Sequence, residues 1–309
     1  MGAIVGKCSL FQLFGMATIN IFFYTLNTYI IFNIFKVSDI GGTMNIHAFG
    51  AYFGVITSWF FKPREAIEDK GELGKGNYLS DLVSMIGTLF LFAYWPSFNG
   101  ATASGSHQMR AVINTYLSLS ASVIASIVVA RICKGRKLEM EIILNASLAG
   151  GVVMGCNCDI IANAYGAMLC GIVAGTVSSF GYAFIGPYLA KHANLHDTCG
   201  VHNLHGMPAV IGAIASAIIV SRSADNYGPN YSENFFTPRT PSQQAFYQLI
   251  SLGCSLGFGI FGGLISGLIT GNHNPFFNPP PVEKFFDDTW AWDECEIDHR
   301  ILYNLQVQR

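Results

Sequence analysis

The sequence predicts an all-α polytopic membrane protein. Of its 309 residues, 51% are hydrophobic and 12% are charged, whereas soluble domains carry roughly 25% charged residues. The charged residues divide the chain into apolar segments that are long enough to cross a bilayer, which takes about 20 residues. One polar motif also occurs twice, each time at the start of such a segment. We therefore expect a membrane protein with an internal repeat.

The gaps between charged residues define eight predicted membrane-spanning helices. The first apolar run is too long for a secretory signal peptide and lacks a small-residue cleavage site, so we expect it to remain as a helix. Clusters of Gly, Pro and Asn between the runs mark turns. The predicted spans are 8–35, 40–61, 82–109, 111–130, 142–158, 160–190, 198–221 and 240–282.

The distribution of Lys and Arg predicts the orientation of the helices, because these residues are in excess on the cytoplasmic side. With the N-terminus inside, the cytoplasmic loops and the tail hold 13 of the 17 basic residues. Both termini are therefore predicted to be cytoplasmic. The four basic residues predicted outside are Lys36, Arg110, Arg222 and Arg239.

The repeated motif reads DIGGTMNIH from Asp39 to His47 and DTCGVHNLH from Asp197 to His205. In both copies Gly follows the Asp at +3, Asn stands at +6 and His at +8. A histidine in hydrocarbon is costly and indicates function by default. Because the context is duplicated, we expect the two histidines to share one site rather than to be unrelated core residues.

Helix geometry predicts where this site lies. Eight residues of α-helix rise about 12 Å, so an Asp at the mouth of a helix places its His two turns inside, toward the middle of a core about 30 Å thick. A carboxylate is also stabilised by the N–H groups and the dipole of a helix N-terminus. Asp39 and Asp197 are therefore interpreted either as N-caps or as groups that attract a cation.

The predicted topology inverts the two copies. The His47 helix is the second and runs from outside to inside, whereas the His205 helix is the seventh and runs from inside to outside. Inverted repeats are a transporter architecture in which the substrate path lies near the midplane between the halves. If one repeat has five helices and ends in the motif helix, the first repeat of this chain lacks its first helices.

Several long runs resemble the Rhesus glycoproteins of the ammonium transporter family. The resemblance covers roughly residues 9 to 295 and implies the inverted-repeat ammonium-transporter fold without its N-terminal helices, a homotrimer, and a hydrophobic ammonia pore in each subunit. In this sequence the two facing pore histidines match His47 and His205. The runs that carry the resemblance are IHAFGAYFG (46–54), GTLFLFAYWPSFNGA (87–101), RAVINTYLSLSASV (110–123), NASLAGGVVMG (145–155) and DTCGVHNLHGMPAVIG (197–212).

The resemblance also implies roles for other residues. Phe98 matches the inner phenylalanine of the extracellular gate, although spacing alone favours packing or lipid contact for the aromatic residues around it. Asp39 and Asp197 match two buried acids that support the histidines. Asp81 and Glu139 fall where acidic residues line the cytoplasmic vestibule, with Glu139 in place of an expected Asp.

The chemistry of such a pore follows from the cost of charge. Moving a bare ion into an apolar channel costs, in an idealised Born calculation, on the order of 20 kcal/mol. Potassium cannot lose its charge, whereas ammonium can release a proton in the vestibule and cross as ammonia. A neutral imidazole offers one donor and one acceptor, and its reference pKa of about 6.5 suits proton transfer. The sequence leaves open whether the histidines relay the proton or stay neutral, and whether carbon dioxide also passes.

Two other classes of protein compete with this reading. Two intramembrane histidines could be the axial ligands of a haem, but there is no CxxCH motif and nothing resembles a nucleotide-binding domain. Alternatively, the chain is a non-conducting Rh-type subunit or a truncated isoform within a membrane complex. We expect no enzyme activity, no metal, no cofactor and no nucleic-acid partner.

The remaining features concern the surface and the ends of the chain. Asn230 begins a glycosylation sequon in a loop that the topology places outside, so it is a candidate for glycosylation in a multi-pass protein of the plasma membrane. Residues 1–271 are predicted to form the transmembrane domain and 272–309 an acidic cytoplasmic tail. This tail either docks on the bundle or a partner, or stays solvated.

Overall fold

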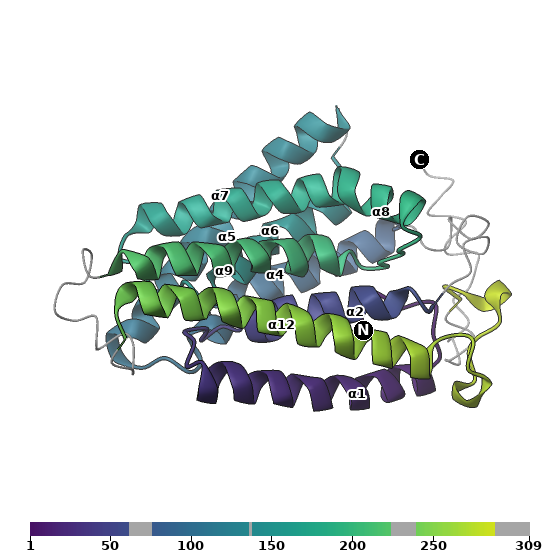
Figure 1. Cartoon of the computed structure of the whole chain (residues 1–309). Helices are drawn as coiled ribbons and strands as arrows, with labels where there is room; N and C mark the ends of the chain where they lie inside the picture. The colour runs from purple at the N-terminus through teal and green to yellow at the C-terminus, as the bar shows by residue number, and fades with distance from the viewer. Residues whose placement is uncertain (62–75, 136–137, 224–238, 288–309) are drawn as a thin grey trace.

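The computed structural model describes residues 1–61, 76–135, 138–223 and 239–287. Figure 1 shows the long helices running side by side along a common axis, with the connections gathered at the two ends of the bundle. Over the residues described, the regular structure is helical and includes no strand. The fold class predicted from the sequence is therefore confirmed.

Each predicted span contains helix. The order is α1 (Leu10–Thr28) with the π-helical turn η1 (Tyr29–Ile34), η2 (Thr43–Ala48) with α2 (Phe49–Ser58), α4 (Tyr78–Gly100), α5 (Gly105–Lys134), α6 (Met140–Met154), α7 (Ala164–Phe180) with η3 (Gly181–Ile185) and α8 (Gly186–His192), η4 (His202–Gly206) with α9 (Met207–Ser221), and α12 (Pro241–Thr270). Six helices in the described ranges are long and apolar enough to cross a membrane.

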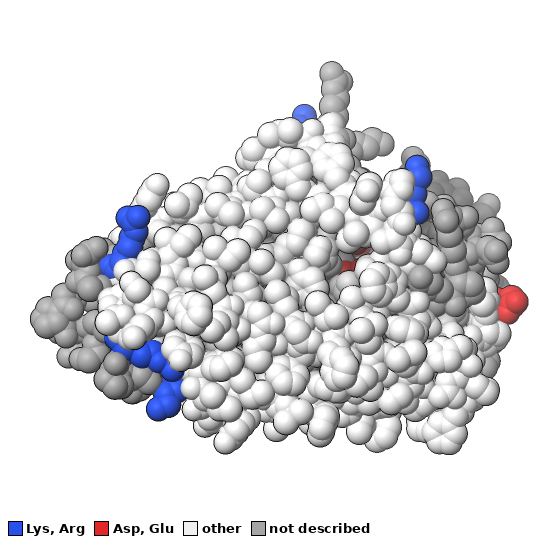
Figure 2. Space-filling view, in the orientation of Figure 1, with Lys and Arg blue, Asp and Glu red and all other residues white. Residues whose placement is uncertain are grey.

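The space-filling view agrees with a membrane-embedded bundle. On the face drawn in Figure 2, most Lys and Arg lie toward the two ends, apart from basic atoms at the upper edge, and the broad band between is uncharged except for acidic atoms recessed in a hollow. Such a band is the surface expected of a protein whose middle lies in hydrocarbon. The chain is a multi-pass membrane protein.

Local sequence explains where the long helices begin. Ser9 caps α1 in a capping box with Gln12, and Thr240 caps α12 in the same way with Gln243. Each box satisfies two backbone N–H groups that the first helical turn would otherwise leave unpaired. Pro241 occupies the first position of α12, where proline's missing N–H costs nothing.

Short side chains let α5, α6 and α7 approach closely. Ser118 and Ser122 of α5 donate hydrogen bonds to Gly150 O and Ala146 O of α6, at 2.8 and 2.7 Å. On the other side, a Cβ placed on Gly175 of α7 would lie 2.7 Å from Ser122 O, so only glycine fits there. Small residues and buried hydroxyls are the usual means of packing helices in membranes.

The helices differ in how much of their surface is buried. All residues from Ala146 to Ile160, in and just after α6, are buried, so this 15-residue helix lies at the centre of the bundle. In the most apolar stretch of α4, by contrast, only 6% of residues are buried. α4 therefore presents an apolar face outward, in a position to contact lipid or another protein segment.

The first part of the predicted tail, residues 272–287, docks on the N-terminal segment. The hydroxyl of Ser9 donates to Phe277 O at 2.8 Å, and the N–H of Phe286 donates to Gly6 O at 2.7 Å. The more acidic part of the tail, from 288 onward, lies outside the described residues. The same is true of the sequon at Asn230.

Candidate functional site

The two repeated histidines meet inside the bundle. The ring centroids of His47 and His205 are 5.1 Å apart and the ring planes differ by 6°, so the imidazoles are stacked. His47, in η2, has only 8% of its surface exposed, and His205 lies in η4. The structure thus joins the two residues that the duplicated motif predicted to share a site.

The two aspartates hold the two motifs in the same way. Oδ2 of Asp39 accepts hydrogen bonds from the backbone N–H groups of Met44 and Asn45, at 2.9 and 2.8 Å. Oδ2 of Asp197 accepts from the N–H of His202 at 2.8 Å, which is again the residue at +5. Each carboxylate therefore holds the turn that carries a histidine, although the N-cap positions themselves are Gly42 and Val201.

The start of each motif differs from the regular helix that the sequence analysis assumed. Gly42 and Gly200 have φ of +73° and +64°, in the left-handed region that only glycine adopts at little cost. Helical structure starts after these glycines, and it starts as a π-turn. Each histidine consequently lies in the first turns of its helix rather than two α-helical turns beyond its Asp. π-turns are uncommon and occur frequently at functional sites.

Two aromatic residues of α4 lie beside the pair. The ring of Phe98 is 6.0 Å from that of His47, and Trp95 stacks on His47 at 5.8 Å with a tilt of 21°. The sequence analysis named Phe98 but gave Trp95 no role. Two features could have indicated a role for Trp95. It stands three residues before Phe98, and it packs against Gly151 on α6, where a Cβ would lie 2.5 Å from its ring.

A cavity of about 360 Å³ lies against the stacked rings. We call it the histidine cavity. His47 Nε2 and His205 Nδ1 are buried without a hydrogen-bond partner, so the site contains polar atoms that the protein does not satisfy. The lining is otherwise almost entirely apolar or glycine, and comprises Met1, Met16, Ala17, Asn20, Ile46, His47, Gly50, Ala51, Phe53, Gly54, Val201 and His205.

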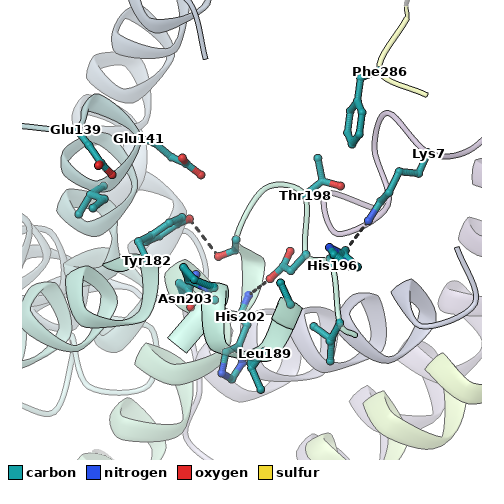
Figure 3. A pocket seen from close by; sticks show the side chains of 17 residues that line it. Lys7, Glu139, Glu141, Tyr182, Leu189, His196, Thr198, His202, Asn203 and Phe286 are labelled. Carbon is teal, nitrogen blue, oxygen red and sulfur yellow. Dashed lines mark hydrogen bonds between the residues drawn. The ribbon is translucent and has the colours of Figure 1, made fainter. Parts of the chain in front are cut away.

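A second cavity, of about 320 Å³, lies at the Asp197 motif and is called the Asp197 cavity. Figure 3 shows acidic, basic and imidazole side chains converging on it. Glu139 lines it, and Glu141 adds a second carboxylate. Asp81 lies in the first turn of α4, outside the lining of this cavity.

Lys7 contributes a basic side chain to the Asp197 cavity. Its side chain is only 1% exposed, and Nζ donates to His196 O at 2.5 Å (Figure 3). Burial lowers the pKa of Lys7 from 10.5 to about 8, although the nearby carboxylate of Asp197 favours the charged form. Burial also raises the pKa of Asp197, and the hydrogen bond from the His202 backbone opposes this shift.

A third cavity, of about 720 Å³, lies at the Asp39 motif. Asp39 and Asp159 are both part of its lining, together with Lys36. Ile46 lines this cavity and the histidine cavity alike. A cavity lined by acidic residues therefore lies at the start of each of the two motifs that carry the histidine pair.

The stacked geometry argues against a haem between the histidines. A metal–imidazole bond is about 2 Å long, and two such bonds plus the two distances from nitrogen to ring centre exceed the 5.1 Å between the centroids. Across the described residues, no group of three or more His, Cys, Asp or Glu side chains is arranged to hold a metal ion.

Fold and site together define a helical, multi-pass membrane protein with a buried histidine pair contributed by two copies of one motif. The model of the ammonium transporter family matches residues 1–274. The chain belongs to the ammonium transporter family, as the sequence motifs predicted, and this is a family of transporters rather than enzymes.

Its curated relatives include Rh proteins. Ammonium transporter Rh type C of Canis lupus familiaris is 41% identical over 304 residues, which cover 96% of this chain and 65% of the relative. Ammonium transporter Rh type B of Mus musculus is 40% identical over 299 residues, covering 94% and 65%. The chain spans about 65% of the length of these curated relatives.

A solved structure has the same fold. The chain resembles Rh50 of Nitrosomonas europaea, from the Rhesus protein family of channels, with a TM-score of 0.74 and 27% identity. The match covers 100% of this chain and 75% of that one.

Proposed function

We propose that this chain forms a path for ammonia and ammonium across a membrane, with His47 and His205 lining the path. The observation that carries the proposal is the stacked pair of imidazoles, 5.1 Å apart, beside an almost wholly apolar cavity. The relatives, which are named as ammonium transporters, support the choice of substrate.

The proposed mechanism separates the proton from the ammonia. Ammonium is deprotonated in a vestibule, neutral ammonia passes the histidine pair, and it is protonated again on the other side. A bare cation in this cavity faces an idealised desolvation cost on the order of 20 kcal/mol. The unpartnered nitrogens His47 Nε2 and His205 Nδ1 replace part of the hydrogen bonding that ammonia loses when it leaves water.

Other predicted residues take supporting roles in this mechanism. Asp39 and Asp197 fix the turns that orient the histidines, since each carboxylate accepts backbone hydrogen bonds at the start of its motif. Phe98, beside His47, narrows the approach to the pair. Glu139 and Asp81 are proposed to concentrate ammonium at the cytoplasmic entrance, and Glu139 lines the Asp197 cavity.

We further propose that the protein works as a homotrimer in the plasma membrane, with both termini in the cytoplasm, glycan at Asn230 outside and residues 272–309 as a cytoplasmic tail. The apolar and little-buried surface of α4 supports assembly with other subunits. Carbon dioxide is a second candidate for passage, because it is small and uncharged.

The test is transport by the purified chain in liposomes. An ammonium gradient is imposed, and an enclosed pH dye reports entry of ammonia. We expect His47→Ala and His205→Ala each to slow the initial rate markedly, and His192→Ala, at an exposed position on α8, to leave it unchanged. Equal rates in all four proteins would refute the role of the histidine pair. A wild-type chain without transport would instead support a non-conducting subunit.

A further inference from the structure

A third histidine, His202, lies between the Asp197 cavity and the histidine cavity. His202 is three residues before His205 on the same π-turn, η4. It lines the Asp197 cavity, whereas Val201 and His205 line the histidine cavity. The turn 202–206 is thus the wall between the two cavities, with one imidazole on each side.

The His202 side chain is held by both motif helices. Its ring packs edge-on against Tyr52 of α2, with centroids 5.6 Å apart and planes at 78°. Its Nδ1 is buried without a partner, and it lies where a Cβ on Gly206 would approach to 3.1 Å. Figure 3 shows the ring beside Asn203 and Leu189 in the Asp197 cavity. A packed imidazole has its lone pair in a fixed position, as proton transfer requires.

We propose that His202 accepts the proton that ammonium releases in the Asp197 cavity, an inference that rests on the proposed function. One N–H bond of ammonium breaks and its electron pair stays on nitrogen, which gives ammonia. The lone pair of the neutral His202 imidazole forms the new N–H bond, which gives imidazolium. The imidazolium then returns the proton to water in the cavity, and ammonia moves toward His205.

The surroundings of His202 suit this exchange. A mixed set of charges provides both attraction for ammonium and a route for the proton away from the ring. The titratable and charged groups around it are Asp197 and His196 on the preceding loop, Glu139 and Glu141 at the start of α6, Lys7 on the N-terminal segment, Tyr182 on η3 and Tyr52 on α2.

The test is chemical rescue in the liposome assay. We expect His202→Ala to lower the initial rate of ammonium-driven transport by about tenfold or more, and added imidazole to restore most of it. His202→Gln, which keeps hydrogen bonding but cannot accept the proton, should be as slow and should not respond to imidazole. The matched control His192→Ala should transport like the wild type with or without imidazole.

The outcomes separate this inference from the function on which it rests. Wild-type rates in both His202 variants, with slow transport by His205→Ala, would overturn the role of His202 and leave the pore proposal intact. Slow His202→Ala without rescue would assign His202 a structural role and also overturn it. If the wild-type chain does not transport, the proposed function fails and the role of His202 fails with it.

Discussion

Replacing Gly151 with alanine tests whether packing behind the histidine pair positions it. A Cβ at Gly151 would lie 2.5 Å from Cε2 and Nε1 of Trp95, well inside normal contact, which is about 3.5–4.0 Å. The ring of Trp95, 7% exposed, has His47 as its neighbour on one side. It must therefore move by about 1 Å toward His47 or distort α6, and such overpacking costs about 1–3 kcal/mol.

The assay is thermal unfolding in detergent, followed by tryptophan fluorescence, together with the liposome assay. With a shift on the order of 2 °C per kcal/mol for a large domain, the expected loss in Tm is roughly 2–6 °C, and transport should slow. Gly87→Ala on α4 is the matched control, because a Cβ there meets nothing within 4 Å. A Gly151→Ala protein as stable and as active as the Gly87→Ala protein would refute the reasoning.

Three further predictions concern other parts of the site. Gly200→Ala should lower Tm, because alanine at φ +64° costs about 1–2 kcal/mol and the new methyl meets the ring of Tyr182; an unchanged Tm contradicts this. Because the pKa of Lys7 falls from 10.5 to about 8 on folding, the unfolded chain binds more protons between these pH values. The wild type should therefore gain stability relative to Lys7→Met as pH rises from 8 to 10.5, and a Tm difference independent of pH would refute the shift. Phe98→Ala should raise potassium leak into liposomes several-fold by widening a hydrophobic constriction, whereas Phe90→Ala, with 61% of the residue exposed, should not.

Sequence reasoning located the helices and the histidine pair because both depend on patterns within short stretches of the sequence. The gaps between charges follow from the cost of charge in hydrocarbon, and each gap contains a helix. The duplicated spacing from Asp to Gly to His requires two similar backbones, and the two copies form the same capped turns.

The parts that the sequence did not predict depend on contacts between distant segments. Trp95 reaches His47 only because Gly151, on another helix, leaves room for its ring. The π-turns could not be predicted from the spacing of apolar residues, because one extra residue in a single helical turn leaves that spacing almost unchanged. The position of His202 on the wall between two cavities likewise depends on how η4 packs against α2.

The late start of the two motif helices has an electrostatic consequence. A helix has the equivalent of about half a positive charge at its N-terminus, and η2 and η4 start only a few residues before His47 and His205. The positive ends of the two macrodipoles lie at Asp39 and Asp197, whose carboxylates accept the N–H groups there. Each carboxylate therefore compensates the partial positive charge of the helix that carries its histidine, and removing either one would leave that charge uncompensated a few residues from the stacked rings.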